Sequence, residues 1–217
     1  MKNYKAYTKV LVGLLIFFSL MSILVVFDLT ANLDHDFGQA FLLKSPGAFK
    51  IVKAFTSLFN PLMATGIGIA LTLIFFACKK FWQGGLVGLS LGIGAAVNFL
   101  FKNLIRMERP AYKLIDEAGF SFPSGHSNAA AAISVALMLV VENSKMDART
   151  KRILKFLLGL FMFAMAMSRI MVGVHFLSDI LGGLSLGAAS ALALYICIYK
   201  FKNRTQAKSK KALVFLY

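Results

Sequence analysis

Six long apolar stretches restrict what this chain can fold into more than any other feature. They cover residues 10–27, 61–78, 84–101, 124–141, 153–168 and 180–199. A helix needs roughly 17–25 mostly apolar residues to cross a bilayer, and all but the fifth stretch reach that length. Hydrophobic residues make up 59% of the 217, above the roughly 45–50% that is typical of soluble domains. The pattern predicts an all-α polytopic membrane protein with six transmembrane helices, forming a single domain over residues 1–217.

The charged residues indicate how these helices are oriented. The formal net charge is +15, which in a soluble protein would suggest nucleic-acid binding. Here the cations cluster at the ends of the apolar stretches, so we interpret them as membrane-surface charges and expect no nucleic-acid partner. With the N-terminus inside, the inner segments hold sixteen of the 24 lysines and arginines. The positive-inside rule therefore predicts that both termini are cytoplasmic.

The last residues, 200–217, form a basic tail that this topology places in the cytoplasm. They contain six of the lysines and arginines. Such a tail can anchor the chain to anionic lipids, or it can simply be a solvated end of the chain.

Residues 29–60 connect the first two apolar stretches and contain a shorter periodic segment. Ala48, Ile51, Val52, Phe55 and Phe59 fall on one helical face. This spacing predicts a short amphipathic helix on the outer membrane surface. The helix could act as a lateral gate for a lipid substrate, or it could be a connector that rests on the headgroups.

The stretch 168–179, between the fifth and sixth apolar stretches, holds the most informative polar residues. Arg169, His175 and Asp179 are costly near a membrane unless they have a function. If the chain is helical from about residue 174, His175 and Asp179 share a helix face. The carboxylate can then fix the imidazole tautomer and leave the other ring nitrogen free as a nucleophile. Because the Arg169 guanidinium suits phosphate oxygens, the stretch predicts a phosphoryl-transfer site.

A second polar patch lies where the third apolar stretch ends, at the same predicted membrane face. It contains Lys102 and Arg109. Together with Arg169 these residues place three cations at one face. A dianionic phosphoryl group would offset their repulsion and has enough oxygens to contact all three.

A third patch, at the start of the fourth stretch, adds an anion site and a proton donor. Ser124 can cap this helix, Gly125 lets a ligand approach the backbone, and the free N–H groups there point at an anion. His126 is placed to protonate a leaving oxygen. Elsewhere, Asp34-His35-Asp36 could in principle bind a cation, but no other residues complete a ligand set. We predict an ordinary polar loop there, and no metal.

In chain order, the three patches resemble the signature of the type 2 phosphatidic acid phosphatase superfamily, which also includes vanadium haloperoxidases. That signature reads Lys-x6-Arg-Pro, then Pro-Ser-Gly-His, then Ser-Arg-x5-His-x3-Asp. The chain matches every position of it, at Lys102, Arg109, Pro110, Pro123, Ser124, Gly125, His126, Ser168, Arg169, His175 and Asp179. The motifs span residues 102–179, and the six-helix layout extends the resemblance to nearly the whole chain.

The resemblance implies a metal-independent catalytic cycle without cofactors. His175 would attack phosphorus and form a phosphohistidine, with Asp179 orienting it. His126 would protonate the leaving group, and water would then release phosphate. The phosphoryl oxygens would be held, as charge spreads in the transition state, by Lys102, Arg109, Ser124, Gly125 and Arg169.

The membrane setting indicates a lipid phosphate as substrate. Family members of this size are bacterial plasma-membrane enzymes that act on undecaprenyl pyrophosphate or phosphatidylglycerophosphate. We expect undecaprenyl pyrophosphate, because the site is predicted to face outward, where that carrier is released. Phosphatidylglycerophosphate or phosphatidate is the alternative. A lipid phosphotransferase and a vanadate haloperoxidase would share the constellation, whereas a non-enzymatic lipid transporter would leave the histidine pair unexplained.

Overall fold

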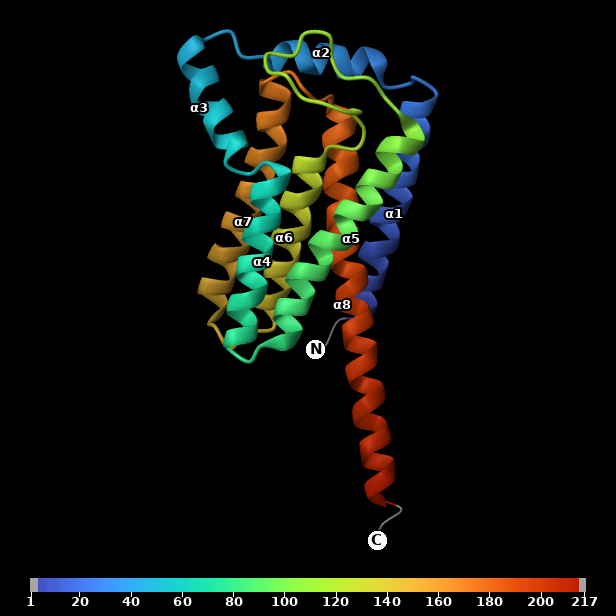
Figure 1. Cartoon of the computed structure of the whole chain (residues 1–217). Coiled ribbons are helices and arrows are strands. Elements are labelled where there is room, and N and C mark those ends of the chain that lie inside the picture. Colours follow the sequence, from blue (N-terminus) through green and yellow to red (C-terminus); the bar gives the residue numbers. More distant parts are fainter. Residues whose placement is uncertain (1–3, 215–217) are drawn as a thin grey trace.

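The structure, a computed structural model, describes residues 4–214, except for the side chains of residues 61, 204 and 206–214. All regular secondary structure within that range is helical, which confirms the predicted all-α class. Figure 1 shows the eight helices: α1 (Tyr4–Val26), α2 (Ala31–Phe41), α3 (Pro46–Ser57), α4 (Pro61–Ala77), α5 (Phe81–Ile105), α6 (Gly125–Glu142), α7 (Ala148–Met171) and α8 (Leu177–Val214).

Five of these helices are by themselves long and apolar enough to cross a membrane, namely α1, α5, α6, α7 and the Leu177–Asn203 part of α8. Helix α4 has 17 residues, which give about 25 Å of helix. This length is at the lower limit for a span, and α3 and α4 together form a longer candidate span that is bent by 46°. Helix α4 packs against α5 and α6 within the bundle. The six apolar stretches therefore correspond to five single-helix spans, and the bent pair of α3 and α4 is the candidate for the sixth.

Helix α8 is the centre of the bundle and packs against α1, α5 and α6 (Figure 1). Glycines allow its close contact with α6. A Cβ on Gly183 or Gly187 would collide with the backbone oxygens of Ser124 and Asn128. Small residues at four-residue spacing let helices approach in this way. The start of α6 is therefore held directly against the start of α8.

Residues 29–60 form two helices, where the sequence predicted one. Helix α3 is the predicted amphipathic helix, and Pro46 at its start has the fixed φ that suits the first helical position. Phe55 and Phe59 pack into the core. Ile51, which we placed on the same face, is instead 72% exposed.

Helix α2 contains Asp34-His35-Asp36, so the prediction of a loop there is wrong. The Asp34 carboxylate is buried and ties α2 to the start of α8. It accepts hydrogen bonds from the Ser178 backbone N–H at 2.8 Å and from the Ser178 hydroxyl at 2.7 Å. Burial raises the pKa of Asp34, and the bonds from Ser178 act against that rise. This aspartate has a structural partner far along the chain, which a local sequence pattern could not reveal.

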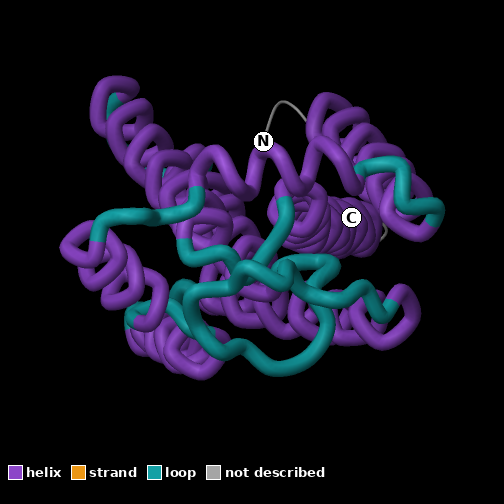
Figure 2. Tube along the Cα trace, turned by 90° about the horizontal axis from the view of Figure 1, so that it is seen from above, coloured by secondary structure: helices purple, strands orange, loops and turns teal. Residues whose placement is uncertain are grey.

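A long loop, residues 106–124, connects α5 to α6 and lies across one end of the bundle (Figure 2). It begins where Arg106 takes a left-handed conformation and ends α5. Backbone hydrogen bonds hold it down: the Leu114 N–H donates to the Val172 carbonyl, and the Ser121 N–H donates to the Met107 carbonyl. The loop therefore joins α5 and the α7–α8 connection at this end of the bundle.

At the opposite end of the bundle, α1 begins and α8 runs on past the other helices (Figure 1). Helix α8 continues to Val214, so the first part of the predicted tail 200–217 is a helical extension of the last span. Residues 215–217 lie outside the described range.

Candidate active site

The proposed nucleophile lies in the short connection between α7 and α8. His175 is 2% exposed, and its Nδ1 lies 3.1 Å from the Oδ2 of Asp179. Helix α8 begins only at Leu177, so His175 precedes the helix on which we had placed it. The Asp179 carboxylate also accepts the Phe176 backbone N–H at 2.8 Å. A side chain in the first helical turn that satisfies the N–H group before the helix is one half of a capping box.

This contact determines which ring nitrogen of His175 can react. Because Nδ1–H donates a hydrogen bond to the carboxylate, the lone pair is on Nε2. Arg109 donates to Nε2 from Nη1 at 3.2 Å. Burial, and then the positive charges of Arg109, Arg169 and Lys102, lower the pKa of His175 well below its ordinary value. The imidazole is therefore neutral and nucleophilic at neutral pH.

Ser121 is a third member of this cluster that sequence reasoning missed. Its buried hydroxyl donates to Asp179 Oδ2 and lies 3.3 Å from His175 Nδ1. It stands three residues before Ser124, just outside the matched motif. A lone serine between Phe120 and Phe122 was the signal that could have found it.

Arg109 and Lys102 fix the long loop as well as supplying charge. The Arg109 guanidinium donates to the carbonyls of Ala118, Gly119 and Val174, each at 3.0 Å. The Lys102 ammonium donates to the carbonyls of Phe120 at 2.5 Å and Ser121 at 3.0 Å. The two predicted phosphate-binding cations therefore also hold the backbone of the long loop in place beside His175.

The Ser124-Gly125-His126 patch opens α6, and Ser124 is the predicted N-cap. Its hydroxyl accepts the Ser127 backbone N–H at 3.4 Å. The Ser124 N–H donates to the backbone carbonyl of Asp179 at 3.0 Å. Gly125 is the first helical residue, at the end of a helix where N–H groups attract anions. This backbone hydrogen bond joins the anion site predicted at the start of α6 to Asp179, the residue that holds the proposed nucleophile.

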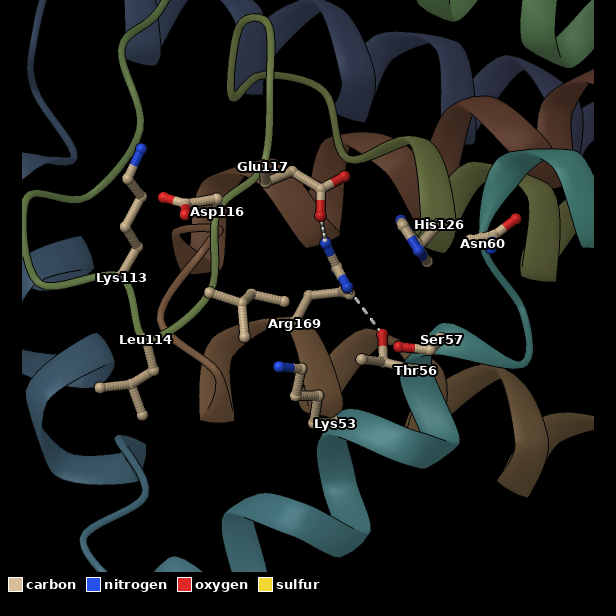
Figure 3. Close-up of a pocket in the computed structure, with 11 residues that line it drawn as sticks. Lys53, Thr56, Ser57, Asn60, Lys113, Leu114, Asp116, Glu117, His126 and Arg169 are labelled. Carbon is tan, nitrogen blue, oxygen red and sulfur yellow. Dashed lines mark hydrogen bonds and ion pairs between the residues drawn. The ribbon is translucent and has the colours of Figure 1, made fainter.

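Arg169, in the last turn of α7, has two partners that the sequence did not predict. Its side chain is almost fully buried. Nη1 donates to the Thr56 hydroxyl of α3 at 2.7 Å, and Nη2 forms an ion pair with Glu117 of the long loop (Figure 3). A buried charge is costly unless it is paired, and Glu117 supplies the counter-charge here, while the buried Nε of Arg169 has no hydrogen-bond partner. A phosphoryl oxygen arriving at Arg169 would compete with that carboxylate.

A cavity of about 530 Å³ lies beside Arg169 (Figure 3). His126 lines it too, as do side chains from α3 and from the long loop. His175 and Asp179 are not among its lining residues. Both histidines are buried, His175 at 2% and His126 at 4% exposed, but His126 lines this cavity and His175 does not.

The eight predicted site residues gather at one end of the bundle. Asp179 and Arg109 contact the proposed nucleophile, His175, and Lys102 bonds the backbone of the neighbouring loop. Ser124 and Gly125 start the adjoining helix. His126 and Arg169 border the cavity. Among residues 4–214, no group of three or more His, Cys, Asp or Glu side chains is placed to hold a metal ion.

Comparison with known proteins gives a consistent result. The sequence model of the PAP2 superfamily matches residues 83–203. Phosphatidylglycerophosphatase B of Bacillus subtilis (strain 168) is 28% identical over 203 residues, which are 92% of this chain and 98% of that protein.

Two solved structures have the same fold. One is the crystal structure of the first transmembrane PAP2-type phosphatidylglycerolphosphate phosphatase from Bacillus subtilis. It matches with a TM-score of 0.79 at 26% identity, over 88% of this chain and 96% of that one. LpxE of Aquifex aeolicus matches with a TM-score of 0.60 at 21% identity, over 75% of this chain and 94% of that one, and shows a shared fold alone. The chain therefore belongs to the PAP2 superfamily.

Proposed function

We propose that this membrane lipid phosphatase hydrolyses phosphatidylglycerophosphate to phosphatidylglycerol and phosphate, through a phosphohistidine at His175. The observation that carries the chemistry is the position of His175, whose Nδ1 lies against Asp179 and whose Nε2 lies beside Arg109. The substrate is supported by the Bacillus subtilis sequence match and by the solved Bacillus subtilis structure, both of which are named for that lipid. This support places our alternative ahead of undecaprenyl pyrophosphate, which the sequence had led us to prefer.

In the first step, Nε2 of His175 attacks the terminal phosphorus as the bond to the glycerol oxygen breaks. His126 gives its proton to that oxygen, and phosphatidylglycerol leaves. Arg109 lies next to Nε2, so it is placed to move from the ring nitrogen to a phosphoryl oxygen. Hydrogen-bond donors that are already in place stabilise the negative charge that develops in the transition state, and they account for much of the rate enhancement of such enzymes.

In the second step, water attacks the phosphohistidine. Its proton passes to His126, the nitrogen–phosphorus bond breaks, and phosphate leaves. His175 returns to its neutral form and His126 to its protonated form. Each histidine therefore ends the cycle in the state in which it began, with no metal taking part.

The junction between α3 and α4 is the side of the site where a lipid could enter from the bilayer. Leu58 is 69% exposed and Leu62 is 80% exposed. They are close in sequence to Ser57 and Asn60, which line the cavity. An apolar surface beside a polar cavity suits a lipid whose headgroup enters while its chains stay in the membrane. The excess of lysine and arginine at the other end supports a cytoplasmic location of both termini and an outward-facing site.

The test is phosphate release in detergent with excess chelator, from phosphatidylglycerophosphate, undecaprenyl pyrophosphate and phosphatidate. We expect the highest kcat/KM with phosphatidylglycerophosphate, and no loss of activity on chelation. His175→Ala should remove turnover of all three lipids, because no covalent intermediate can form. A clear preference for undecaprenyl pyrophosphate would overturn the substrate, and substantial activity in His175→Ala would overturn the mechanism.

A further inference from the structure

Two lysines outside the matched motifs are among the residues that line the cavity bordered by His126. Lys53 comes from α3 and Lys113 from the long loop, and both line the cavity together with Arg169 (Figure 3). Ser57 and Asn60 add polar groups from the α3–α4 junction. The mechanism above uses none of these four side chains, so their role is open.

The position of His126 indicates what this cavity holds. This step rests on the proposed function, in which His126 protonates the leaving oxygen. The leaving group must therefore extend from the His126 side of the phosphoryl group, which is the side of the cavity. In phosphatidylglycerophosphate the leaving alcohol is a glycerol whose far carbon carries a phosphodiester. A second negative charge would thus enter the cavity with the substrate.

We propose that Lys53 and Lys113, with Ser57 and Asn60, form a subsite for the phosphodiester of the lipid headgroup. Lysine is a strong phosphate binder that acts as a point charge. Of the two acidic residues that line the cavity, Asp116 and Glu117, the second is already paired with Arg169. The Asn60 Oδ1 accepts the Met63 N–H at 2.9 Å, which fixes the amide so that its nitrogen can donate to the lipid.

The subsite would make α3 a specificity element of the enzyme. Thr56 of α3 bonds Arg169 at 2.7 Å, so the helix that carries Lys53 is attached to a residue of the phosphoryl site. Phosphatidate has diacylglycerol as its leaving alcohol and brings no second phosphate into the cavity. The lysines should therefore favour phosphatidylglycerophosphate over phosphatidate.

The experiment compares Lys53→Gln, Lys113→Gln and the double variant with wild type on both lipids in detergent. Exposed charge pairs contribute up to about 1 kcal/mol, so each single change should lower kcat/KM for phosphatidylglycerophosphate about three- to fivefold. The double variant should lose about tenfold, while the rate with phosphatidate changes less than about twofold. Lys50→Gln is the matched control, because Lys50 is one turn away on α3 and is not among the lining residues.

A second measurement uses the product as a probe. Phosphatidylglycerol carries the same phosphodiester, so it should inhibit phosphatidate hydrolysis by wild type more strongly than by the double variant. High salt should reduce both differences, because exposed charges are screened.

The outcomes separate the subsite from the proposed function. If wild type prefers phosphatidylglycerophosphate but the double variant loses both activities equally, or Lys50→Gln behaves like Lys53→Gln, the subsite is wrong and the function stands. Equal inhibition of wild type and double variant by phosphatidylglycerol would also overturn the subsite. A wild-type enzyme that cleaves phosphatidate but not phosphatidylglycerophosphate would overturn both.

Discussion

The two histidines of the site occupy contrasting regions of the molecule. His175 is enclosed, with Asp179, Ser121 and Arg109 all within hydrogen-bond distance of its ring. His126 borders an open cavity whose other walls come from α3 and the long loop. His175, the proposed nucleophile, is thus held in one orientation by short contacts, whereas the proposed position of the leaving group is a space with room for different headgroups. In the proposed mechanism, the enclosed cluster carries the chemistry and the cavity selects the lipid.

The largest loss of activity is expected when the contact between His175 and Asp179 is removed. Asp179→Asn keeps the shape of the side chain but would favour the wrong imidazole tautomer. The corresponding change in a serine protease triad lowers kcat by about 10⁴-fold, and we expect a loss of about 10³–10⁴-fold for every lipid. Phosphate release and thermal unfolding in detergent would check this. Near-normal rates in a folded variant would contradict the pairing.

A smaller loss is expected at Ser121, which touches the same carboxylate. Hydrogen bonds to charged groups contribute about 1.5–3 kcal/mol, so Ser121→Ala should lower kcat at least about tenfold while KM changes little. Ser185→Ala is the control, because Ser185 is also buried but bonds only the Gly182 carbonyl of its own helix. Equal effects of the two changes would mean that Ser121 is merely structural.

The Arg169–Glu117 pair lies between the two regions and should respond to ligand. Glu117→Gln leaves a buried guanidinium without its counter-ion, and we expect about 2 kcal/mol of destabilisation, below the 3–5 kcal/mol of fully buried pairs. Vanadate, as a phosphate analogue, should restore more stability to the variant than it adds to wild type. Thermal unfolding with and without vanadate measures this. An equal shift in both proteins would argue that Arg169 does not meet the phosphoryl group.

The smallest expected effect is a shift in pH dependence. Since the pKa of His175 is lowered by burial and by Arg109, the acid limb of kcat/KM should lie below pH of about 6.5, the ordinary value for histidine. Arg109→Gln removes a positive charge beside the ring, so protonation becomes easier and the limb should move to higher pH. The alkaline limb is expected in kcat, because His126 must carry a proton in the enzyme–substrate complex. An unmoved acid limb in Arg109→Gln would assign that limb to another group.

The sequence revealed the members of the site that belong to contiguous motifs, and it missed those defined only by packing. Thr56 and Glu117 lie 113 and 52 residues from Arg169 in the chain, so no local pattern connects them. Helix α2 was missed because its polar residues resemble a loop, although Asp34 is buried by its contact with Ser178. The apolar stretches located the candidate spans, but they could not show that α3 and α4 form one bent pair.

The central claim, a covalent phosphohistidine on the enclosed histidine, is tested most directly by the stereochemical course at phosphorus. A phosphorothioate analogue of phosphatidylglycerophosphate, made chiral with ¹⁸O at the terminal phosphorus, would be hydrolysed in H₂¹⁷O and the released thiophosphate analysed. Two successive in-line displacements, first by His175 and then by water, predict net retention of configuration. Net inversion would mean that water attacks the lipid directly, and it would contradict the covalent mechanism.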